Sequence, residues 1–377
     1  MTFSEMPYLR PDMDAVKQQL AGLTRRLQQA ASYAEAKEAF LKKEELERHV
    51  STAGTLVSIR HSIDTRDAFY DAEEKFWNAA LPELEEYEQA WTDAMLKSPF
   101  RADFSAEYGD LMFVNAEIKL KTFSPEIIPD LQKENDLTQE YEKLLASAQI
   151  PFEGKAYTLS QLTPFKMDPD DARRLAAWKA EGAWYKEHQP ELDRLYDELV
   201  RLRDGMGKKL GYEGYIPLGY YRMGRNCYTR KDVENFRAAV VKYLVPVADE
   251  IYRRQAKRMG KPYPMNYADN AIEFRSGNPK PQGGPEDILA EGLAFYKDLS
   301  PETAEFFTTM TESGLLDVLS TEGKQSGGYC TSLPDYGVPF IFANFNGTQH
   351  DVEVVTHEAG HAFAGWLNRS RVPLEYH

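Results

Sequence analysis

The sequence is poor in cysteine, in positive charge and in long apolar runs. Its two cysteines, Cys227 and Cys330, lie far apart and do not make a disulfide framework. No apolar run approaches the roughly twenty residues that a membrane-spanning helix needs. The first residues, Met1–Pro7, have neither the basic region nor the apolar region of a secretion signal. Together these absences predict a cytoplasmic protein.

Basic residues are outnumbered, 45 Lys and Arg against 60 Asp and Glu, which gives a net charge of −15. This balance argues against nucleic acid or an anionic membrane surface as a partner. The apolar fraction of 42% is ordinary for a globular protein, and 377 residues can bury a large core in two or three domains. Charge alone does not identify a substrate.

Helical periodicity dominates the chain and predicts a mainly α fold. Apolar residues step by three and four from Val16 to Ala34, with Asp12 or Asp14 as the cap of this helix. Further helices are expected at 36–57, 65–97, 170–186, 190–209 and 231–260, the last divided or kinked by Pro246, and a small hairpin at 150–159. The acidic run at 83–88 is predicted to be a solvated helix face.

Two short segments near the end of the chain form a strand–turn–strand pattern. Gly327–Leu333 and Val338–Phe345 flank the turn Pro334–Gly337. The free edge of such a hairpin can pair with an extended peptide, and Gly327, Gly328 and Tyr329 are the expected substrate-binding residues. Pro339 suits an edge strand. A purely structural hairpin is equally compatible with the pattern.

The segment that follows carries the chemistry. In Thr356-His-Glu-Ala-Gly-His361, the two histidines lie four residues apart, so a helix places them on one face, where they can hold one metal ion. Two imidazoles with a carboxylate partner suit zinc, and Glu358 can act as the base that takes a proton from water. Thr348 and Asp351 read as a capping box that opens the helix at about 349. The alternative is a buried helix whose histidines only form hydrogen bonds.

The motif and its neighbours resemble the M3 family of peptidases, the oligoendopeptidase F type. The resemblance lies in Gly327-Gly-Tyr-Cys-Thr331, Pro339-Phe-Ile-Phe342, Asn346-Gly-Thr348 and Thr356–Phe363, and extends to upstream stretches at 60–65, 121–126, 150–154 and 209–212. It implies an elongated helical shell around a deep channel, with a small β-hairpin beside the zinc helix and one zinc ion at the floor. It also implies cleavage of short oligopeptides, with His357 and His361 as zinc ligands and Glu358 as general base.

The sequence departs from the family pattern after His361. The family takes its third zinc ligand from a glutamate on a downstream helix, whereas only sixteen residues follow His361 here, and Glu375 is their one carboxylate. Ala364 and Leu367 exclude the metzincin spacing. We therefore expect the third ligand beyond His377. We also expect an N-terminal helical region at 1–165 and an incomplete catalytic region at 166–377, as in the first two thirds of a longer enzyme.

Two classes of function follow from these observations. The first is a zinc-dependent endopeptidase acting on oligopeptides, with a zinc aminopeptidase as the alternative within that class. The second is a non-catalytic, helical peptide-binding shell. Cys330 has no evident histidine partner in the sequence and is a weak candidate for a nucleophile.

Overall fold

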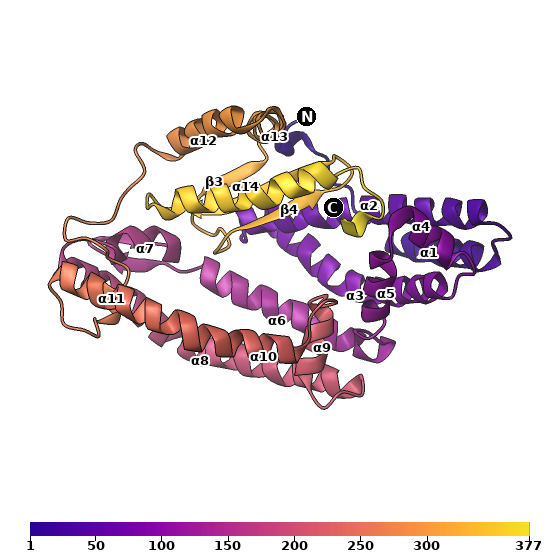
Figure 1. Cartoon of the computed structure of the whole chain (residues 1–377), viewed down its shortest axis with the longest axis horizontal. Coiled ribbons are helices and arrows are strands. Elements are labelled where there is room, and N and C mark those ends of the chain that lie inside the picture. Colours follow the sequence, from indigo (N-terminus) through magenta and orange to yellow (C-terminus); the bar gives the residue numbers. More distant parts are fainter. Residues whose placement is uncertain (377) are drawn as a thin grey trace.

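The computed structural model describes residues 1–376 and is mainly helical, as predicted. The molecule is elongated, with a small sheet near one long side and helices around it (Figure 1). The N-terminal helices are α1 (Met13–Gln29), α2 (Tyr33–Ile63), α3 (Ala68–Leu96), α4 (Arg101–Tyr108) and α5 (Leu111–Lys119). Within residues 1–376, no helix is long and apolar enough to span a membrane.

The first helix forms as its apolar spacing predicts. Asp12 caps it, because its carboxylate accepts hydrogen bonds from the backbone N–H groups of Asp14 and Ala15. Leu20 and Leu27 are buried where α1 packs against α2 and α3. These three helices share one apolar core, so the heptad-like seam serves packing within the chain.

The middle of the chain contains α6 (Ile128–Ala146), the hairpin of β1 (Ile150–Phe152) and β2 (Lys155–Tyr157), α7 (Leu159–Lys166), α8 (Asp171–Lys209) and α9 (Tyr215–Arg222). The hairpin prediction is confirmed. The predicted break between residues 186 and 190 is wrong, because α8 continues through Pro190. Its buried residues Trp184 and Leu195 lie on either side of Pro190, so packing along the helix outweighs the missing N–H group.

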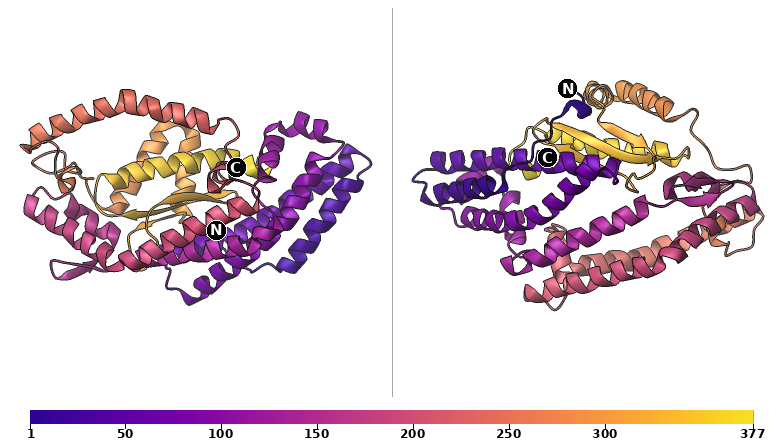
Figure 2. Two further views of the ribbon diagram at one scale, coloured as in Figure 1. Left: turned by 90° about the horizontal axis from the view of Figure 1, so that it is seen from below. Right: turned by 180° about the vertical axis from the view of Figure 1, so that it is seen from behind.

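The next helical run is divided as predicted. α10 (Arg230–Ala239) leads into the π-helical segment η3 (Val240–Leu244), and α11 (Val245–Met259) follows. Pro246 lies in the first turn of α11, where a helix tolerates a residue without an N–H group. Figure 2 shows this run arching along one side of the molecule, and neither α10 nor η3 buries a residue.

A three-stranded sheet follows α12 (Pro285–Leu299) and α13 (Pro301–Glu312). Its strands are β3 (Leu316–Leu319), β4 (Tyr329–Leu333) and β5 (Val338–Phe345), in the order β3-β5-β4. β4 and β5 form the predicted antiparallel hairpin, whereas the parallel strand β3 was not predicted.

The prediction that Pro339 lies in an edge strand is wrong, because β5 is central. The Ile341 N–H donates to Leu315 on the β3 side, and alternation along the strand points the Pro339 nitrogen to that same side. The pairing with β3 begins only at Ile341. The missing N–H therefore falls where no strand is present to accept it.

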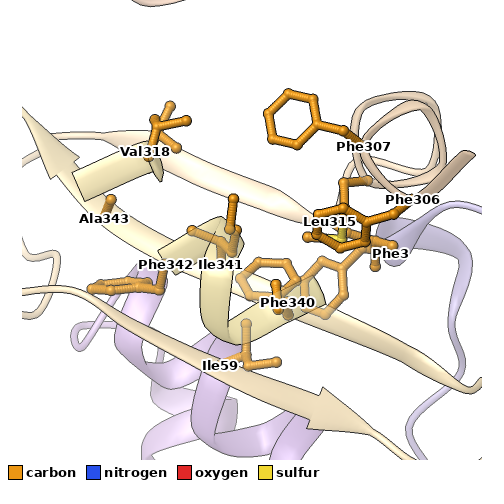
Figure 3. Packing of buried hydrophobic residues seen from close by; sticks show 14 of the residues in the cluster. Phe3, Ile59, Phe306, Phe307, Leu315, Val318, Phe340, Ile341, Phe342 and Ala343 are labelled. Carbon is orange, nitrogen blue, oxygen red and sulfur yellow. The ribbon is translucent and has the colours of Figure 1, made fainter. Parts of the chain in front are cut away.

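The sheet shares its core with the first residues of the chain. Figure 3 shows Phe3 beside Phe340 and Ile59 of α2 below β5, with Phe306 and Phe307 of α13 on the other side. The rings of Phe3 and Phe340 lie 4.4 Å apart, centroid to centroid. Residues from both sides of the predicted 165/166 boundary therefore pack together, and the two-region division stays a prediction.

Candidate active site

The zinc-motif residues lie on α14 (His350–Asn368), which packs on β4 and β5. Its apolar residues Val355, Ala359, Ala362 and Trp366 are buried against the sheet and α13. The opposite face carries His357 and His361, which are exposed. The predicted helix is thus confirmed, and it is amphipathic.

The start of α14 differs from the predicted capping box. The N-cap is Gln349, without a side-chain hydrogen bond. The buried carboxylate of Asp351 instead accepts from the backbone N–H of Asn346 at 3.0 Å and of Gly347 at 2.7 Å. The Thr348 hydroxyl donates to the Asn346 side chain rather than capping the helix. Asp351 therefore ties the end of β5 to α14, which fixes the helix relative to the sheet.

The two histidine side chains converge on one point. Nε2 of His357 and Nε2 of His361 lie 3.2 Å apart, with their rings tilted by 74°. Two zinc–nitrogen bonds of about 2.0–2.1 Å at a near-tetrahedral angle separate the nitrogens by roughly 3.3 Å. The pair thus fits a shared zinc ion when both Nε2 atoms are unprotonated. The same distance also fits a hydrogen bond between the two histidines when one of the two Nε2 atoms carries a proton.

A third protein ligand is not found beside these histidines. Within residues 1–376, no group of three His, Cys, Asp or Glu side chains could hold a metal ion. Glu375 lies in η5 (Leu374–Tyr376), which packs against the N-terminal helices. The backbone N–H of Leu374 donates to Glu44 of α2, and that of Met112 in α5 donates to the Tyr376 hydroxyl. Glu375 is therefore held away from His357 and His361.

Strand β4 borders the histidine site. Glu358 and His361 share a hollow of about 470 Å³ with Cys330, Thr331 and Ser332 of β4. Because β4 is an edge strand, one row of its backbone N–H and C=O groups is not used by the sheet. Burial and the nearby Glu358 raise the pKa of Cys330 to about 12, so its thiol stays protonated at neutral pH. This argues further against Cys330 as a nucleophile.

The two glycines before β4 and the first residue of the strand have clear structural roles. Gly327 has a φ of 95°, which favours glycine, and its carbonyl accepts from the Asn344 side chain at 2.8 Å. A Cβ on Gly328 would lie 3.2 Å from the carbonyl oxygen of Phe342, so the loop packs tightly on β5. The Tyr329 ring stacks on Phe342 at 4.8 Å. Their predicted contact with substrate stays a prediction.

A larger polar cavity of about 550 Å³ begins at the other end of β4. It is lined by β4 together with α2, α3, α6, α8 and α9. It shares Cys330 and Thr331 with the hollow at the histidines, so the two spaces adjoin. Arg222 and Arg203 line it, and both pair with the buried Glu134. Arg222 therefore belongs both to a cavity wall and to a buried polar seam.

The sequence did not predict which carboxylates line cavities. Glu74 and Glu142 line the larger cavity. In the acidic run at 83–88, Glu83 and Glu86 are exposed as predicted, whereas Glu85 and Glu88 border a second cavity with Lys43. An acidic residue on an amphipathic helix usually faces solvent, so the sequence carried no signal for these positions beyond their helical phase.

Two protein-family models match parts of this chain. The Peptidase M3 N-terminal domain matches residues 3–123, and Peptidase family M3 matches residues 301–376. None of the curated proteins compared matches the chain.

Three solved structures are very similar to this one. A chain assigned as an oligoendopeptidase F from Bacillus anthracis str. Ames is 42% identical, with a TM-score of 0.98, covering 100% of this chain and 69% of that one. A second chain assigned as an oligoendopeptidase F is 42% identical, with a TM-score of 0.97 and coverage of 99% and 66%. PZ peptidase A, solved with an inhibitor, is 41% identical, with a TM-score of 0.96 and coverage of 98% and 66%.

The present chain thus spans about two thirds of the length of the solved structures that it matches. Both family matches, the identities above 40% and the same helical fold agree with the motif on α14. The chain belongs to the M3 family of peptidases and is of the oligoendopeptidase F type.

Proposed function

We propose that this protein is a zinc-dependent endopeptidase that hydrolyses short oligopeptides. The observation that carries the proposal is the distance of 3.2 Å between the Nε2 atoms of His357 and His361, on the exposed face of α14. Glu358 and the edge strand β4 share the hollow beside His361. The proposed metal ligands, the proposed base and a free strand edge therefore lie close together.

Each residue has a distinct role in this proposal. His357 and His361 would hold one zinc ion through their Nε2 atoms, with a further protein ligand from outside residues 1–376. Zinc, when bound, supplies the Lewis acidity that polarises a carbonyl and eases deprotonation of water. Glu358 accepts the proton of the attacking water at its carboxylate and delivers it to the leaving amine.

The substrate backbone would be positioned by β4. An extended peptide that pairs with this edge gains backbone hydrogen bonds that do not depend on its sequence. It would pass the Tyr329–Ser332 segment, since Cys330 and Thr331 line both adjoining spaces. This mode suits an enzyme that accepts many short peptides, and Gly327, Gly328 and Tyr329 would lie beside the bound chain.

The second candidate function is a non-catalytic peptide-binding shell. It is favoured by the finding that only two metal-ligand candidates come together in residues 1–376, because two imidazoles bind zinc more weakly than three ligands. A zinc aminopeptidase remains the alternative within the enzyme class. Cleavage of internal bonds in a peptide with a blocked N-terminus separates the endopeptidase from the aminopeptidase.

Replacement of the base provides the sharpest test of the mechanism. Glu358→Gln should reduce cleavage of a quenched fluorogenic oligopeptide by at least about a hundredfold while zinc binding is retained, because no zinc ligand is removed. Glu353→Gln is the matched control, an exposed carboxylate on the same helix. Unchanged turnover in Glu358→Gln would overturn the role assigned to Glu358.

A further inference from the structure

The larger cavity contains two carboxylates that lack a cation. Glu74 of α3 and Glu142 of α6 line it. Neither forms an ion pair or a hydrogen bond that the structure describes within residues 1–376. The nearby cations are already paired: Lys75 and Lys143 with Asp71, and Arg222 with Glu134. When the pair is ionised, no cation described within residues 1–376 pairs with it.

The environment of Glu74 agrees with this geometry. Burial, followed by repulsion from Glu142 and Asp71, raises the pKa of Glu74 to about 7. Burial also raises the pKa of Glu142. No basic side chain contributes to either shift, so nothing in the described chain stabilises the ionised forms.

Two further polar groups in the same cavity lack partners. His61 is only 3% exposed and lines the cavity, yet its Nε2 has no hydrogen-bond partner. This atom lies 3.6 Å from Asp71 Oδ1, which is beyond hydrogen-bond distance. The hydroxyl of Tyr329 is likewise buried without a partner. Unpaired buried polar atoms are costly, and a bound ligand is one way to satisfy them.

The polarity of these groups identifies the ligand class. Two carboxylates accept hydrogen bonds, and the Tyr329 hydroxyl and the neutral imidazole of His61, whose pKa is lowered by burial, can each accept one as well. The matching donor is a cation with several N–H groups. A peptide offers two such groups, its α-ammonium and a lysine or arginine side chain.

We propose that Glu74 and Glu142, with His61 and Tyr329, form a subsite that binds a cationic group of the peptide substrate. This inference rests on the proposed function, because it assigns charge selectivity to the same peptide-binding site. Tyr329 belongs to β4, and Cys330 and Thr331 next to it also border the hollow of Glu358. A peptide paired with β4 therefore places one end at the carboxylates while its backbone reaches the histidines.

Binding measurements test this subsite without turnover. Isothermal titration calorimetry on the Glu358→Gln chain would compare three hexapeptides with amidated C-termini: one with a free N-terminus and no charged side chain, its acetylated form, and an acetylated form with one lysine. The free-amine or the lysine peptide should bind about tenfold more tightly than the neutral acetylated peptide. Which of the two gains affinity identifies the source of the cation.

Substitutions then assign the effect to the carboxylates. The advantage of the cationic peptide should disappear in Glu74→Gln and in Glu142→Gln. It should persist in Glu86→Gln and Asp136→Asn, which neutralise exposed carboxylates on the same two helices, α3 and α6. Circular dichroism of each variant verifies folding.

Three results would overturn the inference: equal affinity for the three peptides, an advantage that survives both glutamine substitutions, or no peptide binding. The proposed peptidase function is judged separately, by zinc content and by cleavage with Glu358 intact. Failure of the subsite is therefore distinguishable from failure of the proposed function.

Discussion

At the residue scale, the chemistry of single side chains depends on burial more than on residue type. Glu74 and Glu86 are both glutamates on α3, but one lines a cavity and the other is exposed. The sequence predicted His357, Glu358 and His361 as candidate site residues, because their spacing within one helix is itself the signal. It could not identify Glu74 or Glu142, because their proximity depends on how α3 and α6 pack.

Replacement of Glu74 should change how stability depends on pH. Its folded-state pKa is raised from 4.5 to about 7, so between these pH values the folded state binds more protons than the unfolded state. Stability therefore falls as pH rises through that window. Glu74→Gln removes this loss. The drop in the free energy of unfolding between pH 4.5 and pH 8 should therefore be about 1–3 kcal/mol smaller in the variant than in the wild type.

Urea denaturation of the wild type and Glu74→Gln at both pH values measures this difference, with Glu86→Gln as the control. An identical pH dependence in the wild type and Glu74→Gln would mean that the Glu74 carboxylate is well solvated.

The two cysteines should differ strongly in reactivity. Cys227 is exposed, whereas Cys330 is partly buried and burial raises its pKa to about 12. At pH 8 the thiolate fraction of Cys330 is then about one in ten thousand. Alkylation with iodoacetamide, followed by mass spectrometry, should label Cys227 at least about a hundredfold faster. Comparable rates would show that β4 opens readily to solvent.

At the element scale, local patterns predicted helices and hairpins better than they predicted contacts between distant segments. The β4–β5 hairpin is formed by neighbouring residues around one turn, and it was predicted. The parallel pairing of β3 with β5 was not, because parallel strands need a long connection and leave no local signal. Pro190 was misjudged for a similar reason, since only the packing on both sides of it keeps α8 continuous.

The junction between β5 and α14 should depend on Asp351. Its buried carboxylate accepts from the N–H groups of Asn346 and Gly347. Asp351→Ala leaves both donors without that partner and should lower the free energy of unfolding by about 1–3 kcal/mol. Thermal denaturation measures the change, with Glu353→Ala as the exposed control on the same helix. Equal loss in both variants would mean that the junction is not specific to Asp351.

At the scale of the whole molecule, the sheet on which α14 packs depends on the beginning of the chain. Phe3 packs on Phe340, and the Arg60 guanidinium lies 5.3 Å from the centre of the Phe3 ring. The elongated helical architecture was predicted through the family resemblance. This shared core was not, because nothing local links residue 3 to residue 340.

Truncation of Phe3 should therefore weaken the distant sheet. Phe3→Ala is expected to lower the free energy of unfolding by about 2–4 kcal/mol, because it removes a buried ring from the core below β5. Hydrogen exchange should show faster exchange in β5 and α14. The exposed Phe69 supplies a control, and Phe69→Ala should have a smaller effect. Unchanged protection of β5 in Phe3→Ala would contradict the shared core.

The most direct test of the central claim is the zinc content of protein that includes the proposed further ligand from outside residues 1–376, measured together with cleavage of a quenched fluorogenic oligopeptide. The wild type and His361→Ala should be compared, with His350→Ala as the control on the exposed first turn of α14. We expect zinc in the wild type and in His350→Ala, loss of zinc in His361→Ala, and cleavage only where zinc is bound. Equal zinc content in all three proteins, or cleavage by zinc-free protein, would contradict a metal site built on His357 and His361.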